Sequence, residues 1–171
     1  MSRSLPTVLT ALILGCSNGG AFKPLAIGDP APRVALRVLD GDSVQVGAGA
    51  AILLVNIWAT WCIPCRAEFP DLQALHQTYA DRGVTVLAVS VDQGRDGPVR
   101  DFVTKAGATF KIGRDPSGET QARYQTVGVP ESFLIGRDGK IAWRKIGALQ
   151  PGARDARTAI DRLLAASDRP R

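Results

Sequence analysis

Two short stretches near the start of the chain alternate between apolar and polar residues. They span 34–38 and 44–46, and Asp40-Gly41 lies between them. An Asp-Gly pair between two alternating runs is typical of a tight β-hairpin turn. The pattern therefore predicts an antiparallel hairpin with one buried face.

Longer apolar patterns predict a layered α/β domain. The nearly continuous apolar runs at 50–58 and 84–91 indicate strands buried on both faces of a sheet. Apolar residues three or four apart indicate helices, and shorter apolar runs between turn residues indicate further strands. The expected helices are 66–82, with a kink at Pro70, and 99–106, 119–124 and 152–166; the further strands are 110–112, 132–135 and 141–146. This order predicts an α/β sandwich with a parallel centre and an antiparallel edge.

The first fifteen residues look like an export signal. One positive charge, Arg3, precedes a mostly apolar stretch at 5–14, which is about half of the roughly 20 residues needed to cross a bilayer. The stretch ends in ILGC at 13–16, which resembles the cleavage box of bacterial lipoproteins, where the Cys is lipidated. We expect a signal peptide at 1–15, a lipidated tether at 16–27 anchored through Cys16, and one domain at 28–171. An ordinary signal with an incidental Cys, or a misplaced start site, is the alternative.

The composition fits one globular domain and argues against nucleic-acid binding. The 171 residues are 45% hydrophobic and 22% charged, unlike disordered chains, which are poorer in apolar residues. The net charge of +5 comes from 21 basic and 16 acidic residues that are interleaved along the chain. Three cysteines are too few for a disulfide-stapled scaffold, and the odd number predicts that one has a separate role.

The strongest chemical signal is the pentapeptide WCIPC at 61–65. It follows a buried strand and opens a helix, the setting that distinguishes a redox pair from a chance CxxC. Cys62 at the helix N-terminus and Cys65 in the first turn would have Cα atoms within the roughly 4.4–6.8 Å that a disulfide requires. The helix dipole would stabilise a thiolate on Cys62, the predicted nucleophile, and the more buried Cys65 would resolve the mixed disulfide. Pro64 removes an N–H that has no partner in this turn.

Two other interpretations of this motif are weak. A structural zinc site needs four ligands, whereas the chain has one CxxC and a single histidine, His76, eleven residues after Cys65. We therefore expect no metal. A purely structural disulfide across three residues would close too small a loop to stabilise the chain much.

The motif and its surroundings resemble a known family. The sequence VNIWATWCIPCRAEFP at 55–70 is similar to the thioredoxin superfamily, and specifically to its extracytoplasmic TlpA, ResA and DsbE (CcmG) branch. The resemblance runs from about Gly28 to Gly152 and implies a thioredoxin-like three-layer sandwich with an N-terminal β-hairpin and an inserted helix in the central region. GVPESFLI at 128–135 resembles the loop that carries a cis-proline beside the disulfide. By this resemblance Pro130 is cis, and the backbone of Val129 pairs with an extended substrate segment.

The resemblance also bears on proton transfer. Thioredoxins carry a buried carboxylate six residues before the first Cys, where this chain has Asn56, which can neither accept nor deliver a proton. In the ResA and DsbE group, carboxylates at the positions of Glu68 and Glu131 are linked to proton control of the thiol pair, and the resemblance implies that role for both. A solvated surface acid is the alternative for each. Trp61 is expected to frame the site or to contact substrate.

The function implied by the resemblance is that of an enzyme, a thiol-disulfide oxidoreductase lipid-anchored on the periplasmic side of the bacterial cell envelope. Its redox group would be the Cys62–Cys65 disulfide, without a cofactor. The PESF string at 130–133 and GALQP at 147–151 favour a disulfide reductase of the cytochrome c maturation type. Its partners would be disulfide-containing proteins, such as apocytochrome c or its assembly factors, and a membrane thiol reductant.

Three alternatives stay open. The residues between the cysteines and the nearby charges tune the reduction potential over a wide range, so an envelope disulfide oxidase or isomerase fits the same motif. A thiol peroxidase of the redoxin group is a second alternative, although the residues that such enzymes place around their reactive Cys are not laid out around Cys62. A non-enzymatic copper chaperone is the third, but it normally uses a CxxxC and a distal His.

Overall fold

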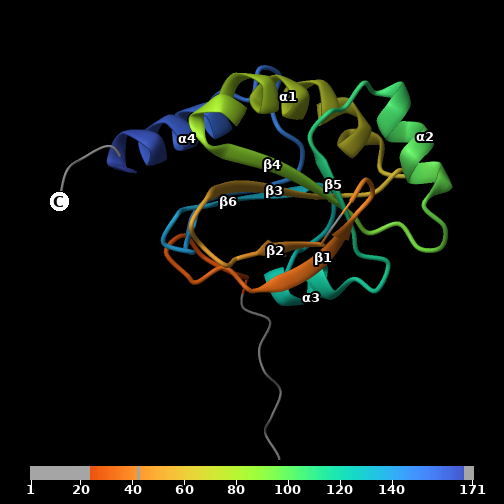
Figure 1. Cartoon of the computed structure of the whole chain (residues 1–171), viewed down its shortest axis with the longest axis horizontal. Helices are drawn as coiled ribbons and strands as arrows, with labels where there is room; N and C mark the ends of the chain where they lie inside the picture. Colours follow the sequence, from red (N-terminus) through yellow and green to blue (C-terminus); the bar gives the residue numbers. More distant parts are fainter. Residues whose placement is uncertain (1–23, 42, 168–171) are drawn as a thin grey trace, which may run out of the picture.

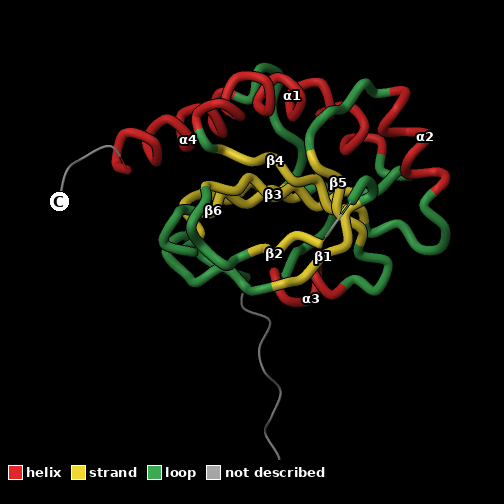
Figure 2. Tube along the Cα trace, viewed as in Figure 1, coloured by secondary structure: helices red, strands yellow, loops and turns green. Residues whose placement is uncertain are grey.

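The computed structural model describes residues 24–41 and 43–167, which form three layers around one mixed sheet (Figure 1; Figure 2). The seven strands are ordered β2-β1-β5-β4-β3-β6-β7 across the sheet. The strands are β1 (Val34–Val38), β2 (Ser43–Val46), β3 (Ile52–Trp58), β4 (Val84–Ser90), β5 (Lys111–Arg114), β6 (Glu131–Ile135) and β7 (Ile141–Ile146). The helices are α1 (Ile63–Tyr79), α2 (Gly97–Lys105), α3 (Glu119–Tyr124) and α4 (Arg154–Ser167), with a 3-10 turn η1 (Ala80–Arg82) after α1.

The centre of the sheet is parallel and its edges are antiparallel. Strands β3, β4 and β5 run parallel, whereas β6 and β7 follow in antiparallel order on one side and the β1–β2 hairpin on the other. Helices α1, α2 and α4 lie over one face, and α3 with the hairpin lies below the other (Figure 1). All seven residues of β3 are buried because both faces are covered, which explains the uninterrupted apolar run at this position.

Alternate residues of the central strands face two different cores. Leu54 and Trp58 of β3 belong to the core beneath α1. Val55 of β3 and Phe133 of β6 belong to the core on the α3 side. Because side chains alternate between the faces of a strand, Asn56 of β3 and its cross-strand neighbour in β6, Ser132, lie on the α1 face. Glu131 lies on the α3 face.

The structure confirms the predicted fold, with small shifts at the ends of elements. Helix α1 begins at Ile63 rather than 66, since Pro64 occupies the first turn, where its missing N–H costs no hydrogen bond. The helix also continues through Pro70. The predicted signal peptide, Cys16 and most of the predicted tether lie outside the described residues. Among the described helices, none is long and apolar enough to cross a membrane.

Candidate active site

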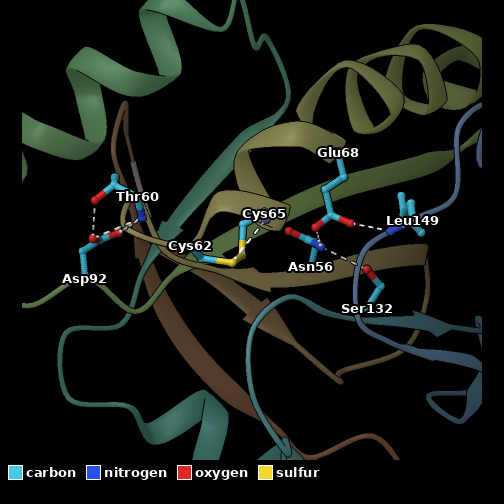
Figure 3. The surroundings of a disulfide bond; sticks show 8 residues. All are labelled: Asn56, Thr60, Cys62, Cys65, Glu68, Asp92, Ser132 and Leu149. Atoms are coloured by element: carbon cyan, nitrogen blue, oxygen red, sulfur yellow. Dashed lines mark hydrogen bonds between the residues drawn. A yellow bond between two sulfur atoms is a disulfide. The ribbon is translucent and has the colours of Figure 1, made fainter.

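Cys62 and Cys65 form a disulfide at the N-terminus of α1 (Figure 3). Their Cα atoms are 5.2 Å apart, within the range that the motif predicts. Cys62 is the N-cap of α1, and its Sγ accepts a hydrogen bond from the backbone N–H of Cys65 at 3.2 Å. The sulfur of Cys62 therefore lies where the unpaired amides and the positive end of the helix dipole stabilise a thiolate once the disulfide is reduced.

The two cysteines differ in their access to solvent. Cys65 is completely buried, and Cys62 is 5% exposed. The residues on either side of Cys62 are among the most exposed apolar side chains described, with Trp61 at 69% and Ile63 at 78%. An incoming partner would meet these two side chains beside Cys62, whereas Cys65 lies behind it in the core.

Glu68 is a buried acid without a counter-ion. It is 1% exposed, one helical turn beyond Cys65 on the same face of α1. Its Oε1 accepts a hydrogen bond from Asn56 Nδ2 at 2.8 Å, and its Oε2 accepts one from the backbone N–H of Leu149 at 2.7 Å. None of the ion pairs within the described part of the chain involves Glu68.

These surroundings shift the titration of Glu68 into the neutral range. Burial raises its pKa from the ordinary value of 4.5 to about 7, although the two hydrogen bonds act in the opposite direction and the charge of Asp71 adds a small upward contribution. A carboxyl group with such a pKa can take up and release a proton near pH 7.

Asn56 of β3 connects Glu68 of α1 to Ser132 of β6 (Figure 3). It is completely buried, and its Nδ2 donates both to Glu68 and to Ser132 Oγ, the latter at 3.0 Å. Its Oδ1 is buried without a hydrogen-bond partner among the described residues. From the sequence alone, Asn56 is recognisable only as a missing acid, because the contacts of its amide group cannot be deduced from the sequence.

The predicted proline loop contains a cis peptide bond, and the acid that follows it has its contacts on the α3 face of the sheet. The Val129–Pro130 peptide bond is cis, the conformation that the resemblance implies. Glu131 follows and is completely buried, but on the α3 face. Its Oε1 accepts a hydrogen bond in an ion pair with Arg144 Nε, and its Oε2 accepts one from the backbone N–H of Val127 at 3.0 Å. The predicted role of Glu131 in proton control stays a prediction.

Asp92, which the sequence analysis did not single out, holds the segment that leads to the disulfide. It is 7% exposed and accepts hydrogen bonds from the backbone N–H of Thr60 at 2.9 Å and from Thr60 Oγ1 at 2.6 Å (Figure 3). Ser90 Oγ donates a third at 2.8 Å. The only sequence signal was an acid directly after a buried strand, and nothing in the sequence pairs it with Thr60, 32 residues earlier.

No cluster of three or more His, Cys, Asp or Glu side chains within 24–41 and 43–167 is arranged to hold a metal ion. The single histidine, His76, lies further along α1, where its ring stands 6.3 Å from that of Phe110. The groups that this arrangement does bring together are a cysteine pair and, one helical turn away, a buried acid with a pKa of about 7.

Comparison with known proteins agrees with this chemistry. The sequence profile of the AhpC/TSA family matches residues 27–144. "Thiol-disulfide oxidoreductase ResA" of Bacillus cereus is 34% identical over 150 residues, covering 82% of this chain and 86% of the relative. "Thiol:disulfide interchange protein CycY" of Rhizobium leguminosarum is 32% identical over 120 residues, covering 70% of this chain and 62% of the relative.

Solved structures support the same assignment. A crystal structure from Chlorobium tepidum, provisionally named thiol:disulfide interchange protein DsbE, superposes with a TM-score of 0.74 at 32% identity, covering 82% of this chain and 99% of that one. The disulfide at the start of α1, the family match and these relatives lead to one conclusion: the chain belongs to the AhpC/TSA family of thioredoxin-like proteins and is a thiol-disulfide oxidoreductase of the ResA, CycY and DsbE type.

Proposed function

We propose that this enzyme is a disulfide reductase of the bacterial cell envelope, of the type that serves cytochrome c maturation. The observation that carries the proposal is a cysteine pair at a helix N-terminus with a buried acid of pKa about 7 one turn away. The similarity to CycY and to the DsbE structure supports the choice of this type. Apocytochrome c or its assembly factors are the proposed substrates.

The reaction begins on the reduced enzyme. The Cys62 thiolate attacks one sulfur of a substrate disulfide, that disulfide breaks, and its other sulfur leaves as a thiolate that takes up a proton. The Cys65 thiol then loses its proton and attacks Cys62 Sγ, which releases the second substrate thiol. Two electrons pass to the substrate, and the enzyme is left with the Cys62–Cys65 disulfide.

Glu68 is the proposed proton acceptor in the second step. A thiol in apolar surroundings becomes nucleophilic only when a base removes its proton, and Cys65 is completely buried. Glu68 lies one turn beyond Cys65 and has a pKa of about 7. It can therefore be ionised when Cys65 must lose its proton, and protonated when the Cys62–Cys65 disulfide is reduced again. Asn56 cannot replace it, because an amide side chain does not titrate.

Substrates are proposed to bind between the exposed side chains beside Cys62 and the proline loop. The backbone of Val129 would pair with an extended substrate segment as an added strand, and Trp61 and Ile63 offer apolar contact area next to Cys62. The ion pair of Glu131 with Arg144 and the hydrogen bond to Val127 would hold this loop in place.

The reduction potential of the Cys62–Cys65 pair tests the direction of electron flow. A reductase should have a potential near or below that of thioredoxin, about −270 mV, whereas a value near that of DsbA, about −120 mV, would instead indicate an oxidase. In an oxidising compartment a reductase needs a source of electrons, and we propose a membrane thiol reductant.

Attachment to the membrane is proposed to occur through a lipid on Cys16. In a bacterial host, Cys16→Ala should abolish fatty-acid labelling and release the protein from the membrane fraction. The variant should keep its disulfide exchange activity, since Cys16 has no part in the reaction. A native protein that carries no fatty acid would contradict the anchor and leave the redox assignment unaffected.

A further inference from the structure

We propose that Asn56 is a positioning residue for the redox step, because its Oδ1 accepts a hydrogen bond from the Cys65 thiol in the reduced enzyme. This inference rests on the proposed exchange chemistry of Cys62 and Cys65. It assigns to Asn56 a function other than that of the acid found at the same place in thioredoxins.

The orientation of the Asn56 amide is fixed by its neighbours. Both hydrogen bonds of the side chain use Nδ2, which donates to Glu68 and to Ser132. When Glu68 is ionised its carboxylate can only accept, which keeps the NH₂ group of Asn56 facing it. The oxygen is consequently directed to the other side of the amide, and Figure 3 shows it on the side of Cys65 and the disulfide.

The oxygen is left without a partner in the oxidised enzyme. Asn56 is completely buried, and its Oδ1 has no donor among the described residues. A buried acceptor without a donor is unfavourable, and native structures contain few of them. No described residue donates to this oxygen while the disulfide is intact, a state in which neither sulfur carries a hydrogen.

Reduction supplies the missing donor. Two electrons and two protons convert the disulfide into two thiols, and the Cys65 S–H group is a hydrogen-bond donor, although a weak one. A bond from this thiol to Oδ1 would satisfy the acceptor only in the reduced state. Asn56 would thereby stabilise the reduced form relative to the oxidised form, which raises the reduction potential.

The same contact would couple the thiol to Glu68. One amide group then receives a hydrogen bond from Cys65 through its oxygen and donates one to the carboxylate through its nitrogen. Hydrogen bonds arranged in such a chain polarise one another. Asn56 would thus hold the Cys65 thiol in a fixed position relative to the Glu68 carboxyl group, which accepts its proton.

Asn56→Leu, of similar size and without polar atoms, tests the proposal in an equilibrium with glutathione. The reaction converts the enzyme disulfide and two glutathione thiols into the enzyme dithiol and one glutathione disulfide. We expect the equilibrium constant to move about tenfold toward the enzyme disulfide, which corresponds to about 30 mV. A change of less than twofold, or a shift toward the dithiol, would overturn the proposal.

Ser132→Ala is the matched control, because it removes one partner of Asn56 Nδ2 and leaves Oδ1 in place. Its equilibrium constant should change by less than threefold. A Ser132→Ala shift as large as that of Asn56→Leu would mean that any disturbance of this polar cluster moves the potential, and the proposal would fail.

If Asn56→Leu does not fold, infrared spectroscopy of the S–H stretch gives the answer without altering Asn56. The spectrum of Cys62→Ser minus that of Cys62→Ser/Cys65→Ser isolates the Cys65 thiol from Cys16. A band at lower frequency than in the unfolded protein is expected, and an unshifted band refutes the hydrogen bond. Failure here is distinguishable from failure of the proposed exchange chemistry, because an enzyme without that chemistry would show no Cys62-dependent exchange at all, and the direction of electron flow is tested separately by the reduction potential.

Discussion

Glu68 and Glu131 are both buried acids that the family resemblance links to the thiol pair, yet their surroundings differ in one decisive respect. Glu68 has two neutral hydrogen-bond donors, the Asn56 amide and the Leu149 N–H. Glu131 has one neutral donor, the Val127 N–H, and the positive guanidinium group of Arg144. Burial therefore raises the pKa of Glu68 to about 7, whereas Glu131 is held in a charged pair.

The difference shows that burial alone does not decide what an acid can do. A buried carboxylate without a counter-ion gains a higher proton affinity, while one with a counter-ion fixes the segments that it connects. Arg144 also donates to the backbone carbonyl of Leu25 at 2.8 Å, so Glu131 and Arg144 link the proline loop, β7 and the start of the described chain. Glu68 suits proton transfer, and Glu131 suits the support of a binding loop.

Substitution of the cysteines is expected to have the largest effect on activity. The roles compared for Glu68 and Glu131 both presuppose disulfide exchange by Cys62 and Cys65. Cys62→Ser should abolish disulfide exchange, because it removes the attacking thiolate, whereas Cys65→Ser should accumulate mixed disulfides with substrates. In the reduced wild type, Cys62 should react with an alkylating reagent much faster than Cys65 at neutral pH. Equal alkylation rates, measured by mass spectrometry of the peptides, would contradict the assignment of roles.

Among single substitutions near the site, removing the counter-ion of Glu131 should cause the largest loss in the free energy of unfolding. Arg144→Met leaves a buried carboxylate without its partner and should lower the free energy of unfolding by about 3–5 kcal/mol. Urea denaturation at pH 7 measures this change. The control is Arg123→Met, which breaks the exposed ion pair with Glu119 and should cost about 0.5 kcal/mol or less. Similar losses for both variants would show that Glu131 does not depend on Arg144.

The absence of a counter-ion at Glu68 should make stability depend on pH. A carboxyl group whose pKa is raised on folding keeps its proton in the folded state after the unfolded chain has lost it, so stability falls as the pH rises from about 4.5 to about 7. The loss should approach about 3 kcal/mol relative to Glu68→Gln, which cannot titrate. Urea denaturation of the two oxidised proteins at pH 5 and pH 8 measures it, and a difference between them that does not change with pH would refute the raised pKa.

Sequence patterns predicted the fold well because they reflect burial, and they predicted the side-chain contacts poorly for the same reason. The buried strands, the hairpins and the CxxC at a helix start all follow from periodicity and local chemistry. The face on which Glu131 lies does not, because all five residues of β6 are buried and no alternation distinguishes the two faces. The ion pair with Arg144 depends on the register between β6 and β7, and that register is a property of the folded sheet.

Asn56 illustrates the same limit within the site. The sequence identifies an amide where thioredoxins have an acid, which excludes proton transfer by this residue. The hydrogen bonds to Glu68 and Ser132 join residues 12 and 76 positions away. They exist because β3, β6 and α1 meet at this point, and the resulting unpartnered oxygen can be recognised only in three dimensions.

The central claim is that Glu68, and not Glu131, transfers the proton during exchange. The most direct test compares the pH dependence of the exchange rate of wild type, Glu68→Gln and Glu131→Gln between about pH 5 and 9. The wild-type profile should inflect near pH 7, where Glu68 titrates. Glu68→Gln should lose this inflection and resolve mixed disulfides more slowly, while Glu131→Gln should retain it. A Glu68→Gln profile that overlays the wild type, or an inflection lost in Glu131→Gln instead, would contradict the assignment of proton transfer to Glu68.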